Sequence, residues 1–358
     1  MLNIELDLIY FMDFSLELAG RVKGVQNRLR EERIDALYLS TPKNVLYLTG
    51  RESGRVLVTE KQAFLWVRDL YTGVYASLYN SKKYPLDVRI YRENAVKERI
   101  KSVKCKKLGV ENLSAGHFKK LKDMLACKVK HTSIVEEERA VKTGYEIEML
   151  KKAAKIAVGG MKKAYSVVKE GVRELDAVAE IEHSIRKLGS ETPPFNDGML
   201  LASGKNGADI HAHASKQKIK KGLVVVDLGG RVKGYYSDMT RTIPVGSLGY
   251  REKDMLDFVR NLELETVDRI EQGMEACEVY NFIESKLKKK HLKFYHSAGH
   301  GIGLEVHEKP GLGPESSDIL QENMVFTIEP GIYVPGKYGI RFEDMVLLTK
   351  KGCKILTK

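Results

Sequence analysis

Hydrophobic and polar positions alternate with short periods in the first part of the chain. An apolar run predicts a buried strand at 36–39, and 87–91 reads as a further strand. Two strand-like runs around a polar turn predict a hairpin. Helical periods between these runs predict a compact mixed α/β domain. The hairpin covers 55–59 and 63–67, and the predicted helices cover 22–33, 69–79 and 115–126.

The second part of the chain begins with longer helical periods. Thr143 precedes Glu146 by one helical turn, which is the pattern of a capping box at the start of a helix. The charged stretch 136–139 interrupts the pattern before it, so we expect domains at 1–133 and 134–358. The predicted helices cover 143–169, 172–187, 251–272 and 277–288, and the predicted strands cover 222–230, 235–242, 324–329, 331–334 and 342–348.

The second part contains an internal echo. Gly171 and Gly273 each separate two predicted helices, and the same offset relates Ile181 to Ile283 in the helices that follow. Two unrelated amphipathic helices would give such a match by coincidence. The echo supports a repeat because each half then ends in strands that carry acidic residues or histidine.

Composition and charge narrow the classes of protein. The chain has 358 residues, of which 43% are hydrophobic and 30% charged, so it is long enough for two domains with buried cores. Lys and Arg exceed Asp and Glu by 60 to 48, for a net charge of +12. The lysines are scattered in pairs, and no basic stripe is interleaved with aromatic residues. We therefore favour a solvated lysine-rich surface over a nucleic-acid partner.

The cysteines and the apolar segments indicate a cytoplasmic protein. None of the four cysteines belongs to a Cys-x-x-Cys pair, which favours reduced thiols over a zinc or redox motif. No apolar stretch approaches the ~20 residues that a membrane span needs. Glu5, Asp7 and Asp13 interrupt the apolar start of the chain and no basic segment precedes it, so we expect neither a signal peptide nor a membrane partner.

Acidic residues at strand ends suggest a metal site in the second domain. Asp227 ends an apolar run, and a buried carboxylate is costly unless a cation compensates it. We expect Asp238 to face it across a hairpin whose turn is 229–234, where two carboxylates repel without a cation. Three further candidates lie in glycine-flanked strand ends: His300, Glu329 and Glu343.

Four carboxylates and one imidazole form a hard, oxygen-rich ligand set. Such a set suits Mn²⁺, Co²⁺ or Fe²⁺ at least as well as Zn²⁺. Five ligands exceed the usual need of one site, whereas two ions about 3.5–4 Å apart that share bridging carboxylates use them all. The residues therefore predict a site for two divalent cations.

The region 135–358 resembles the methionine aminopeptidase/prolidase family of metallopeptidases. The motifs occur at the expected order and spacing: DLG at 227–229, YSDMTRT at 236–242, HSAGHGIGLEVHEKP at 296–310, IEPG at 328–331 and GIRFED at 339–344. The resemblance implies an α+β fold class, with a C-terminal pita-bread fold built from two similar halves. That agrees with the internal echo. It also implies that Asp227, Asp238, His300, Glu329 and Glu343 are metal ligands.

The same resemblance implies roles for the residues around the ligands. Glu329 would also be the general base for a water or hydroxide that bridges the two metals. His211 and His307 would stabilise the oxyanion and assist the leaving nitrogen. The sequence departs from the family at His211, because the family often has proline before this histidine and His213 is an extra neighbour.

The substrate pocket follows from two further matches. His296 and Arg341 occupy positions that line the pocket in proline-specific members. A core histidine and a surface salt bridge are the alternative readings of these two residues. We expect the family roles because both residues lie inside the matched motifs.

The segment 28–50 resembles the creatinase-type N-terminal domain, most clearly in TPKNVLYLTG at 41–50. That domain accompanies creatinase and proline-specific peptidases, whereas methionine aminopeptidases generally lack it. Creatinase itself lacks the metal ligands. The resemblance therefore implies a homodimeric, cytoplasmic Xaa-Pro dipeptidase or Xaa-Pro aminopeptidase. It would act on small peptides and would use two divalent metal ions per subunit. We expect Mn²⁺ or Co²⁺, with Fe²⁺ or Zn²⁺ as alternatives.

Two alternatives stay open at this point. One is a methionine-type or other aminopeptidase of the same fold. The other is a non-catalytic pita-bread module that binds protein or RNA, which the positive charge would suit. Such modules usually lose metal ligands, so the complete ligand set favours an enzyme.

Overall fold

The computed structural model describes residues 2–68, 84–111, 113–125, 127–195 and 198–358. The chain divides into two compact units, residues 1–139 and 140–358, which we call the N-terminal and C-terminal units. The predicted domain boundary between residues 133 and 134 stays a prediction.

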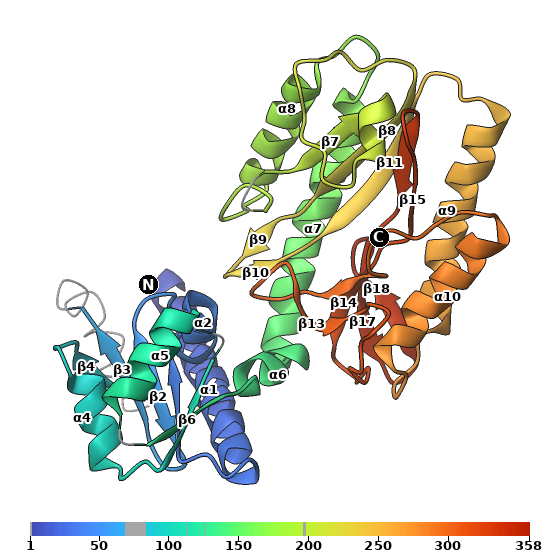
Figure 1. The fold of residues 1–358 in the computed structure, drawn as a ribbon. Helices are drawn as coiled ribbons and strands as arrows, with labels where there is room; N and C mark the ends of the chain where they lie inside the picture. Colours follow the sequence, from blue (N-terminus) through green and yellow to red (C-terminus); the bar gives the residue numbers. More distant parts are fainter. Residues whose placement is uncertain (1, 69–83, 112, 126, 196–197) are drawn as a thin grey trace. The chain divides into compact units, whose positions relative to one another are not determined.

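A six-stranded mixed sheet organises the N-terminal unit, in the order β4-β3-β2-β1-β5-β6 (Figure 1). The predicted hairpin is confirmed, because β2 and β3 pair antiparallel with Arg55 opposite Trp66. The elements are α1 Leu2–Glu31, β1 Ala36–Leu39, α2 Pro42–Thr49, β2 Arg55–Thr59, β3 Ala63–Val67, β4 Asp87–Ile90, α4 Ala95–Ser102, β5 Lys107–Val110, α5 Ala115–Met124 and β6 Lys128–His131.

Apolar runs explain why the central strands lie inside, whereas the two edge strands β4 and β6 are mostly exposed. Every residue of β1 and β3 is buried, and Leu57, Phe64 and Trp66 pack in one cluster with Leu108. Burying one such side chain contributes about 1.5–3 kcal/mol. The helix predicted over 22–33 corresponds to the last part of the longer α1, which ends at Glu31. The helix predicted over 69–79 lies outside the described residues.

Helices and strands of the C-terminal unit follow each other in two similar series. The first series contains α7 Gly144–Val167, α8 Glu174–Lys187, β7 Leu200–Ser203, the 3₁₀ helix η1 Gly204–Ala208, β8 Gly222–Leu228, β9 Arg231–Val232, β10 Tyr235–Tyr236 and β11 Met239–Val245. The helix α6 Ile134–Ala140, at the end of the N-terminal unit, comes before it in the chain. The second contains α9 Tyr250–Arg269, α10 Ala276–Lys289, β12 His300–Gly301, β13 Glu308–Gly311, β14 Val325–Ile328, β15 Gly331–Val334, β16 Tyr338–Arg341, β17 Asp344–Thr349 and β18 Gly352–Ile355.

Each series buries its helices against its own strands. The helices α7 and α8 pack on the sheet β11-β8-β7, and α9 and α10 pack on the sheet β13-β12-β14-β17-β18 (Figure 1). The predicted capping box at the start of α7 is present, since Thr143 and Glu146 exchange hydrogen bonds with each other's backbone N–H groups.

The backbone confirms the internal echo. In the first half, the N–H of Gly171 donates to the carbonyl of Ile219 at 2.9 Å. In the second half, the N–H of Gly273 donates to the carbonyl of Leu320 at 2.8 Å. Both glycines have positive φ, +85° and +94°, which favours glycine at the turn between two helices. We call residues 144–245 and 250–355 the first and second halves.

Four details differ from the sequence prediction. The charged stretch 136–139 is helical, as part of α6. The strand predicted over 235–242 is two strands, β10 and β11, because Ser237 and Asp238 leave the ladder between them. The strand predicted over 342–348 begins at Asp344, and the sequence argument missed β16 before it.

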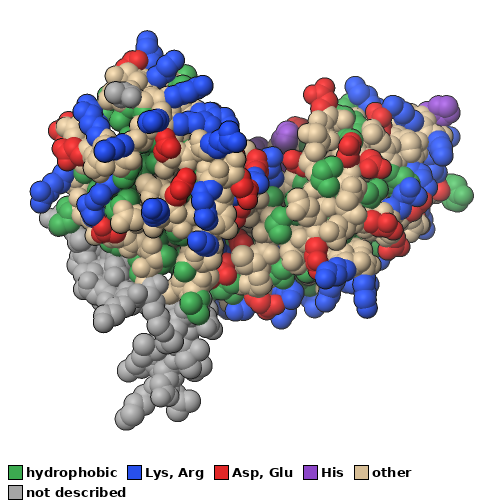
Figure 2. Space-filling model, turned by 90° about the horizontal axis from the view of Figure 1, so that it is seen from below, with side chains coloured by type: hydrophobic (Ala, Val, Ile, Leu, Met, Phe, Trp, Pro, Cys, Tyr) green, Lys and Arg blue, Asp and Glu red, His purple; other side chains and the backbone are tan. Residues whose placement is uncertain are grey.

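Charges are mixed on the surface. On the face drawn in Figure 2, Lys and Arg side chains are interspersed with Asp and Glu and form no continuous stripe. Among the described residues, no helix combines the length and the apolar composition that a membrane crossing requires.

Candidate metal centre

Asp227 and Asp238 come from neighbouring strands of the first half. Asp227 belongs to β8, and Asp238 lies between β10 and β11. The ladder register places Thr240, and not Asp238, opposite Asp227. The carboxyl groups of Asp227 and Asp238 nevertheless interact directly, as the prediction that they face each other requires. The hydroxyl of Ser237 donates to the carbonyl of Ala153 at 2.8 Å, while its backbone N–H still donates across the hairpin to the carbonyl of Gly230 at 2.9 Å.

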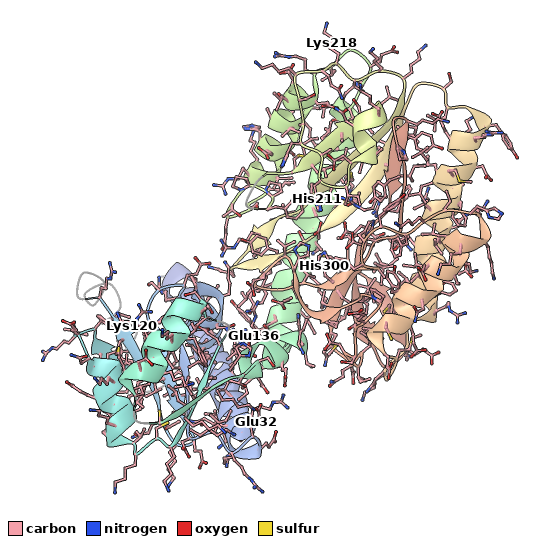
Figure 3. The ribbon with its side chains drawn as sticks, in the orientation of Figure 1. Glu32, Lys120, Glu136, His211, Lys218 and His300 are labelled. Atoms are coloured by element: carbon pink, nitrogen blue, oxygen red, sulfur yellow. The ribbon has the colours of Figure 1, made fainter. Side chains whose placement is uncertain are left out.

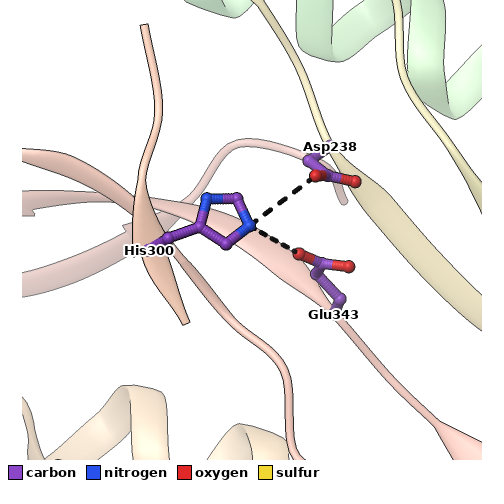
Figure 4. Close-up of side chains that lie close together, drawn as sticks. All are labelled: Asp238, His300 and Glu343. Atoms are coloured by element: carbon purple, nitrogen blue, oxygen red, sulfur yellow. Dashed lines mark ion pairs between the residues drawn. The ribbon is translucent and has the colours of Figure 1, made fainter. Parts of the chain in front are cut away.

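The other candidates come from the second half and converge on one histidine. His300 begins β12, Glu329 follows β14, and Glu343 precedes β17. The Nε2 atom of His300 lies 3.8 Å from an oxygen of Asp238, 3.7 Å from Glu329 and 3.8 Å from Glu343. Figure 4 shows that Asp238 and Glu343 both point toward this nitrogen. The structure therefore brings these four predicted residues together.

The His300 ring presents a lone pair to the carboxylates. Its Nδ1 atom lies 3.2 Å from the carbonyl oxygen of Gly301, which can only accept a hydrogen bond. Nδ1 therefore carries the proton and Nε2 is unprotonated. Burial, reinforced by the nearby His307, lowers the pKa of His300 to about 3, so the ring is neutral at physiological pH.

The carboxylates repel one another inside the protein. Burial, with the nearby Glu343, raises the pKa of Asp238 and of Glu329 well above the ordinary range. Burial and the adjacent Asp227 raise the pKa of Glu343 to about 7. A bound cation would remove this repulsion.

Three carboxylate oxygens at the site have no hydrogen-bond partner. They are Asp227 Oδ1, Asp238 Oδ1 and Glu343 Oε1, all buried. Unpaired buried oxygens beside an imidazole lone pair form a donor set for divalent cations, so the residues present fit a metal centre.

Hydrogen bonds orient the opposite edges of these carboxylates. The hydroxyl of Thr240 donates to Glu343 Oε2 at 2.7 Å, and Arg341 Nη2 donates to Asp227 Oδ2 at 2.6 Å. Arg241 Nη1 donates to the carbonyl of Glu343 at 2.7 Å. Sequence reasoning assigned no role to Thr240 or Arg241; their place in the motif at 236–242 was the available signal.

A chain of hydrogen bonds connects the two predicted pocket residues. His296 Nδ1 lies 2.8 Å from the carbonyl of Ser297, so its Nε2, 2.9 Å from the Tyr333 hydroxyl, accepts from that hydroxyl. Arg341 Nη1 in turn donates to the Tyr333 oxygen at 3.2 Å. Burial, with Arg341 nearby, lowers the pKa of His296 to about 4, so the ring is neutral. Sequence reasoning missed Tyr333, because the residue lies outside the recognised motifs and nothing in the sequence around it indicates that its hydroxyl forms hydrogen bonds.

The remaining two histidines are exposed beside the centre. The rings of His307 and His300 are 4.2 Å apart between centroids. His211 lies near enough to His296 and His307 to contribute to the lowering of both pKa values, although burial is the larger cause. Figure 3 shows His211 and His300 near the middle of the C-terminal unit. The structure therefore places all the candidates that the sequence predicted in one region of the C-terminal unit.

Residues 148–350 match metallopeptidase family M24, and residues 21–141 match the creatinase/prolidase N-terminal domain. The chain belongs to metallopeptidase family M24. The predicted family and the predicted fold class are thereby confirmed, and this M24 metallopeptidase is an enzyme rather than a non-catalytic binding module.

Relatives resemble this M24 metallopeptidase over nearly its full length. The Xaa-Pro dipeptidase of Pyrococcus furiosus is 34% identical and that of Pyrococcus horikoshii 33%, each alignment covering 94% of this chain and 97% of the relative. The solved structure of an Xaa-Pro dipeptidase from Bacillus anthracis has a TM-score of 0.88 at 31% identity, covering 95% of this chain and 98% of that one. The prolidase structure from Pyrococcus horikoshii has a TM-score of 0.86 at 33% identity, with the same coverage.

Proposed function

We propose that this M24 metallopeptidase hydrolyses the peptide bond before proline in small Xaa-Pro peptides. The observation that carries the proposal is the position of His300 Nε2 within 3.7–3.8 Å of the carboxylates of Asp238, Glu329 and Glu343. The pair His296 and Arg341 lies beside them. The names of the relatives support the same substrate class.

Five residues would hold two divalent cations, Mn²⁺ or Co²⁺ in the first place and Fe²⁺ or Zn²⁺ as alternatives: Asp227, Asp238, His300, Glu329 and Glu343. When bound, the cations polarise the scissile carbonyl and lower the pKa of the attacking water. The three unpaired carboxylate oxygens support this assignment.

Glu329 would accept the proton of the attacking water on its carboxylate. Its carboxyl is half-buried at the end of β14, 3.7 Å from His300 and 3.8 Å from His296. His307 and His211 would supply donors on the exposed side, one to the developing oxyanion and one to the leaving nitrogen. Both are exposed next to the centre, where a peptide can reach them.

His296 and Arg341 would line the pocket that receives the substrate. Their hydrogen bonds to Tyr333 fix both side chains before a peptide arrives, which reduces the entropy cost of binding. We also propose a homodimer, a cytoplasmic location and a domain boundary at residues 133 and 134. Light scattering of the purified chain tests the first of these.

A metal-depletion experiment tests the function. The protein is stripped with a chelator, reloaded with Mn²⁺ or Co²⁺, and assayed on Met-Pro, Gly-Pro, a longer Xaa-Pro peptide and Met-Ala. We expect activity only after reloading, and only on the proline peptides. Full activity without metal would refute the mechanism, and cleavage of Met-Ala but not Met-Pro would refute the proline specificity.

A further inference from the structure

One buried carboxylate joins the two ends of the segment that carries His211. Glu174, the first residue of α8, is 0% exposed. It accepts hydrogen bonds from Ser203, just before residues 204–214, and from Ser215 and Gln217, just after them. The donors are Ser203 N at 2.8 Å, Ser203 Oγ at 2.7 Å, Ser215 N at 2.9 Å, Ser215 Oγ at 2.7 Å and Gln217 Nε2 at 2.7 Å.

The donors make the ionised form of Glu174 the stable one. Burial alone would raise the pKa of this carboxyl, but the hydrogen bonds from Gln217, Ser203 and Ser215 outweigh it, and the pKa lies below the ordinary glutamate value. An amide at this position would turn one oxygen into a donor that faces other donors. Glu174→Gln therefore breaks the arrangement while it keeps the size of the side chain.

A second contact fixes the middle of the same segment. A Cβ atom on Gly339 would lie 1.8 Å from the carbonyl oxygen of Gly207, so η1 touches the backbone of β16 directly. The strand β16 carries Arg341. The segment 204–214 is thus held at both ends by Glu174 and in the middle by the strand that lines the proposed pocket.

The second half forms the same backbone bridge without a carboxylate at this position. There the N–H of Ala276 donates to the carbonyl of Asp318 at 2.9 Å, as the N–H of Glu174 donates to the carbonyl of Gln217 at 3.0 Å. The two halves have the same backbone bridge, but alanine stands where the first half has Glu174. The carboxylate is therefore an addition in the half that bears His211.

We infer that Glu174 is a positioning residue that acts through His211, by fixing the segment 204–214 at the edge of the metal centre. The inference rests on the proposed role of His211. Figure 3 shows Lys218, which neighbours Gln217, at the outer end of the unit and away from His300. The five donors to Glu174 come from Ser203, Ser215 and Gln217, which flank the segment, so Glu174 acts through the segment and not through the metals.

A double-mutant cycle separates positioning from general stability. We expect Glu174→Gln to lower kcat/KM by about 10–100-fold, because a displacement of about 1 Å in a group that acts on the substrate can cost on the order of 10²-fold. In a His211→Ala background the same substitution should cost nothing further. The metal content after reloading should equal that of the unmutated protein. Glu146→Gln, a change at another buried glutamate of the first half, is the matched control, and its effect should be the same with and without His211.

Limited proteolysis gives a readout that does not depend on activity. Lys205, Lys216 and Lys218 are exposed within or beside the segment. We expect trypsin to cut there at least about tenfold faster in Glu174→Gln than in the unmutated protein or in Glu146→Gln, because local opening exposes the sites. Mass spectrometry of the fragments identifies the cut.

The outcomes distinguish the inference from the proposed function. Equal losses from Glu174→Gln with and without His211, or an unchanged cleavage rate, would overturn the positioning role while the proposed function stands. Wild-type turnover in His211→Ala would overturn the role of His211 itself, and with it the inference. Failure of the unmutated protein to cleave Xaa-Pro peptides would refute the proposed function and leave the proteolysis result valid.

Discussion

The two halves of the C-terminal unit share a backbone bridge but anchor their exposed histidines differently. In the first half, Glu174 reaches from the helix to both ends of the segment that carries His211. In the second half, the anchor comes from the other side of the bridge: Asp318 pairs with Lys309 Nζ at 3.2 Å and accepts from Gly311 N at 3.1 Å. These last two residues belong to β13, which follows the second exposed histidine.

The difference shows that the repeated backbone places corresponding segments in both halves, whereas the side chains decide how each segment is anchored. The first anchor is fully buried, whereas the side chains of Asp318 and Lys309 are 27% and 41% exposed. The metal centre is divided in the same way. The offset between Gly171 and Gly273 also separates Asp227 from Glu329, so the repeat supplies matching carboxylates, while His300 comes from the second half alone.

The largest expected effect comes from removing one carboxylate from each half. Asp238→Asn and Glu343→Gln should each lower kcat/KM on the order of 10³-fold or more, since each removes a proposed metal ligand. Circular dichroism should show a folded protein in both cases, because neutralising one of several repelling carboxylates does not harm the metal-free fold. Near-normal turnover in either variant would mean that its half does not supply a ligand.

Placing a glutamate in the second half tests whether the shared backbone bridge is enough to accommodate a buried carboxylate. Ala276→Glu puts an acid at the position of Glu174, but Asp318, which can only accept, stands where Gln217 donates. Ala276 is 0% exposed, so the new charge is buried without donors. We expect a loss of about 3–5 kcal/mol in the free energy of unfolding by urea. The control is Ala276→Ser, which adds a polar group without a charge, and unchanged stability of Ala276→Glu would show that the halves are interchangeable there.

A buried acid in the second half predicts a pH effect. Glu263 of α9 is 2% exposed, and burial, with Asp344 nearby, raises its pKa to about 8. In the first half, Met161 of α7 stands at the position that corresponds to Glu263, and its side chain is also 2% exposed. A glutamate in the unfolded chain has a pKa of about 4.3. Because the pKa of Glu263 in the folded protein is about 8, raising the pH from about 4.3 to about 8 stabilises the unfolded state relative to the folded one.

Glu263→Met should therefore stabilise the protein more at high pH than at low pH. We expect its advantage in unfolding free energy to grow by at least about 1 kcal/mol between pH 5 and pH 9. Urea titrations of both proteins at the two pH values measure it. An advantage that is the same at both pH values would show that Glu263 does not titrate in this range.

The smallest effect is expected at the exposed anchor. Asp318→Asn should weaken the contact with Lys309 by up to about 1 kcal/mol, as is usual for a partly exposed ion pair. kcat/KM should then fall by no more than about fivefold, less than in Glu174→Gln. Steady-state kinetics of both variants on the same peptide give the ranking, and a larger loss from Asp318→Asn would reverse it.

The sequence predicted features that depend on local patterns. Apolar runs located β1, β2 and β3, and the capping box located the start of α7. The motifs that resemble the M24 family identified the candidate site residues, and the fold brings these residues into one region. Their individual roles as ligands, bases and pocket residues stay predictions.

Features that depend on distant contacts were not predictable in this way. The Ser237 hydroxyl, next to Asp238, bonds to the carbonyl of Ala153 in α7, a contact 84 residues apart in the sequence. The hydroxyl of Tyr333 joins His296 to Arg341, although no pattern marks it. Likewise, Glu174 reads as an ordinary polar residue at a helix start until the fold brings its five donors together.

The contact between Gly207 and Gly339 limits which sequences this fold accepts. Neither glycine has a positive φ, so their backbones would suit any residue. Space is the constraint, since even alanine at 339 would place a carbon atom 1.8 Å from an oxygen. A complete substitution library should therefore retain only glycine at 339, and a designer who grafts new specificity onto the pocket has to leave this crossing point untouched.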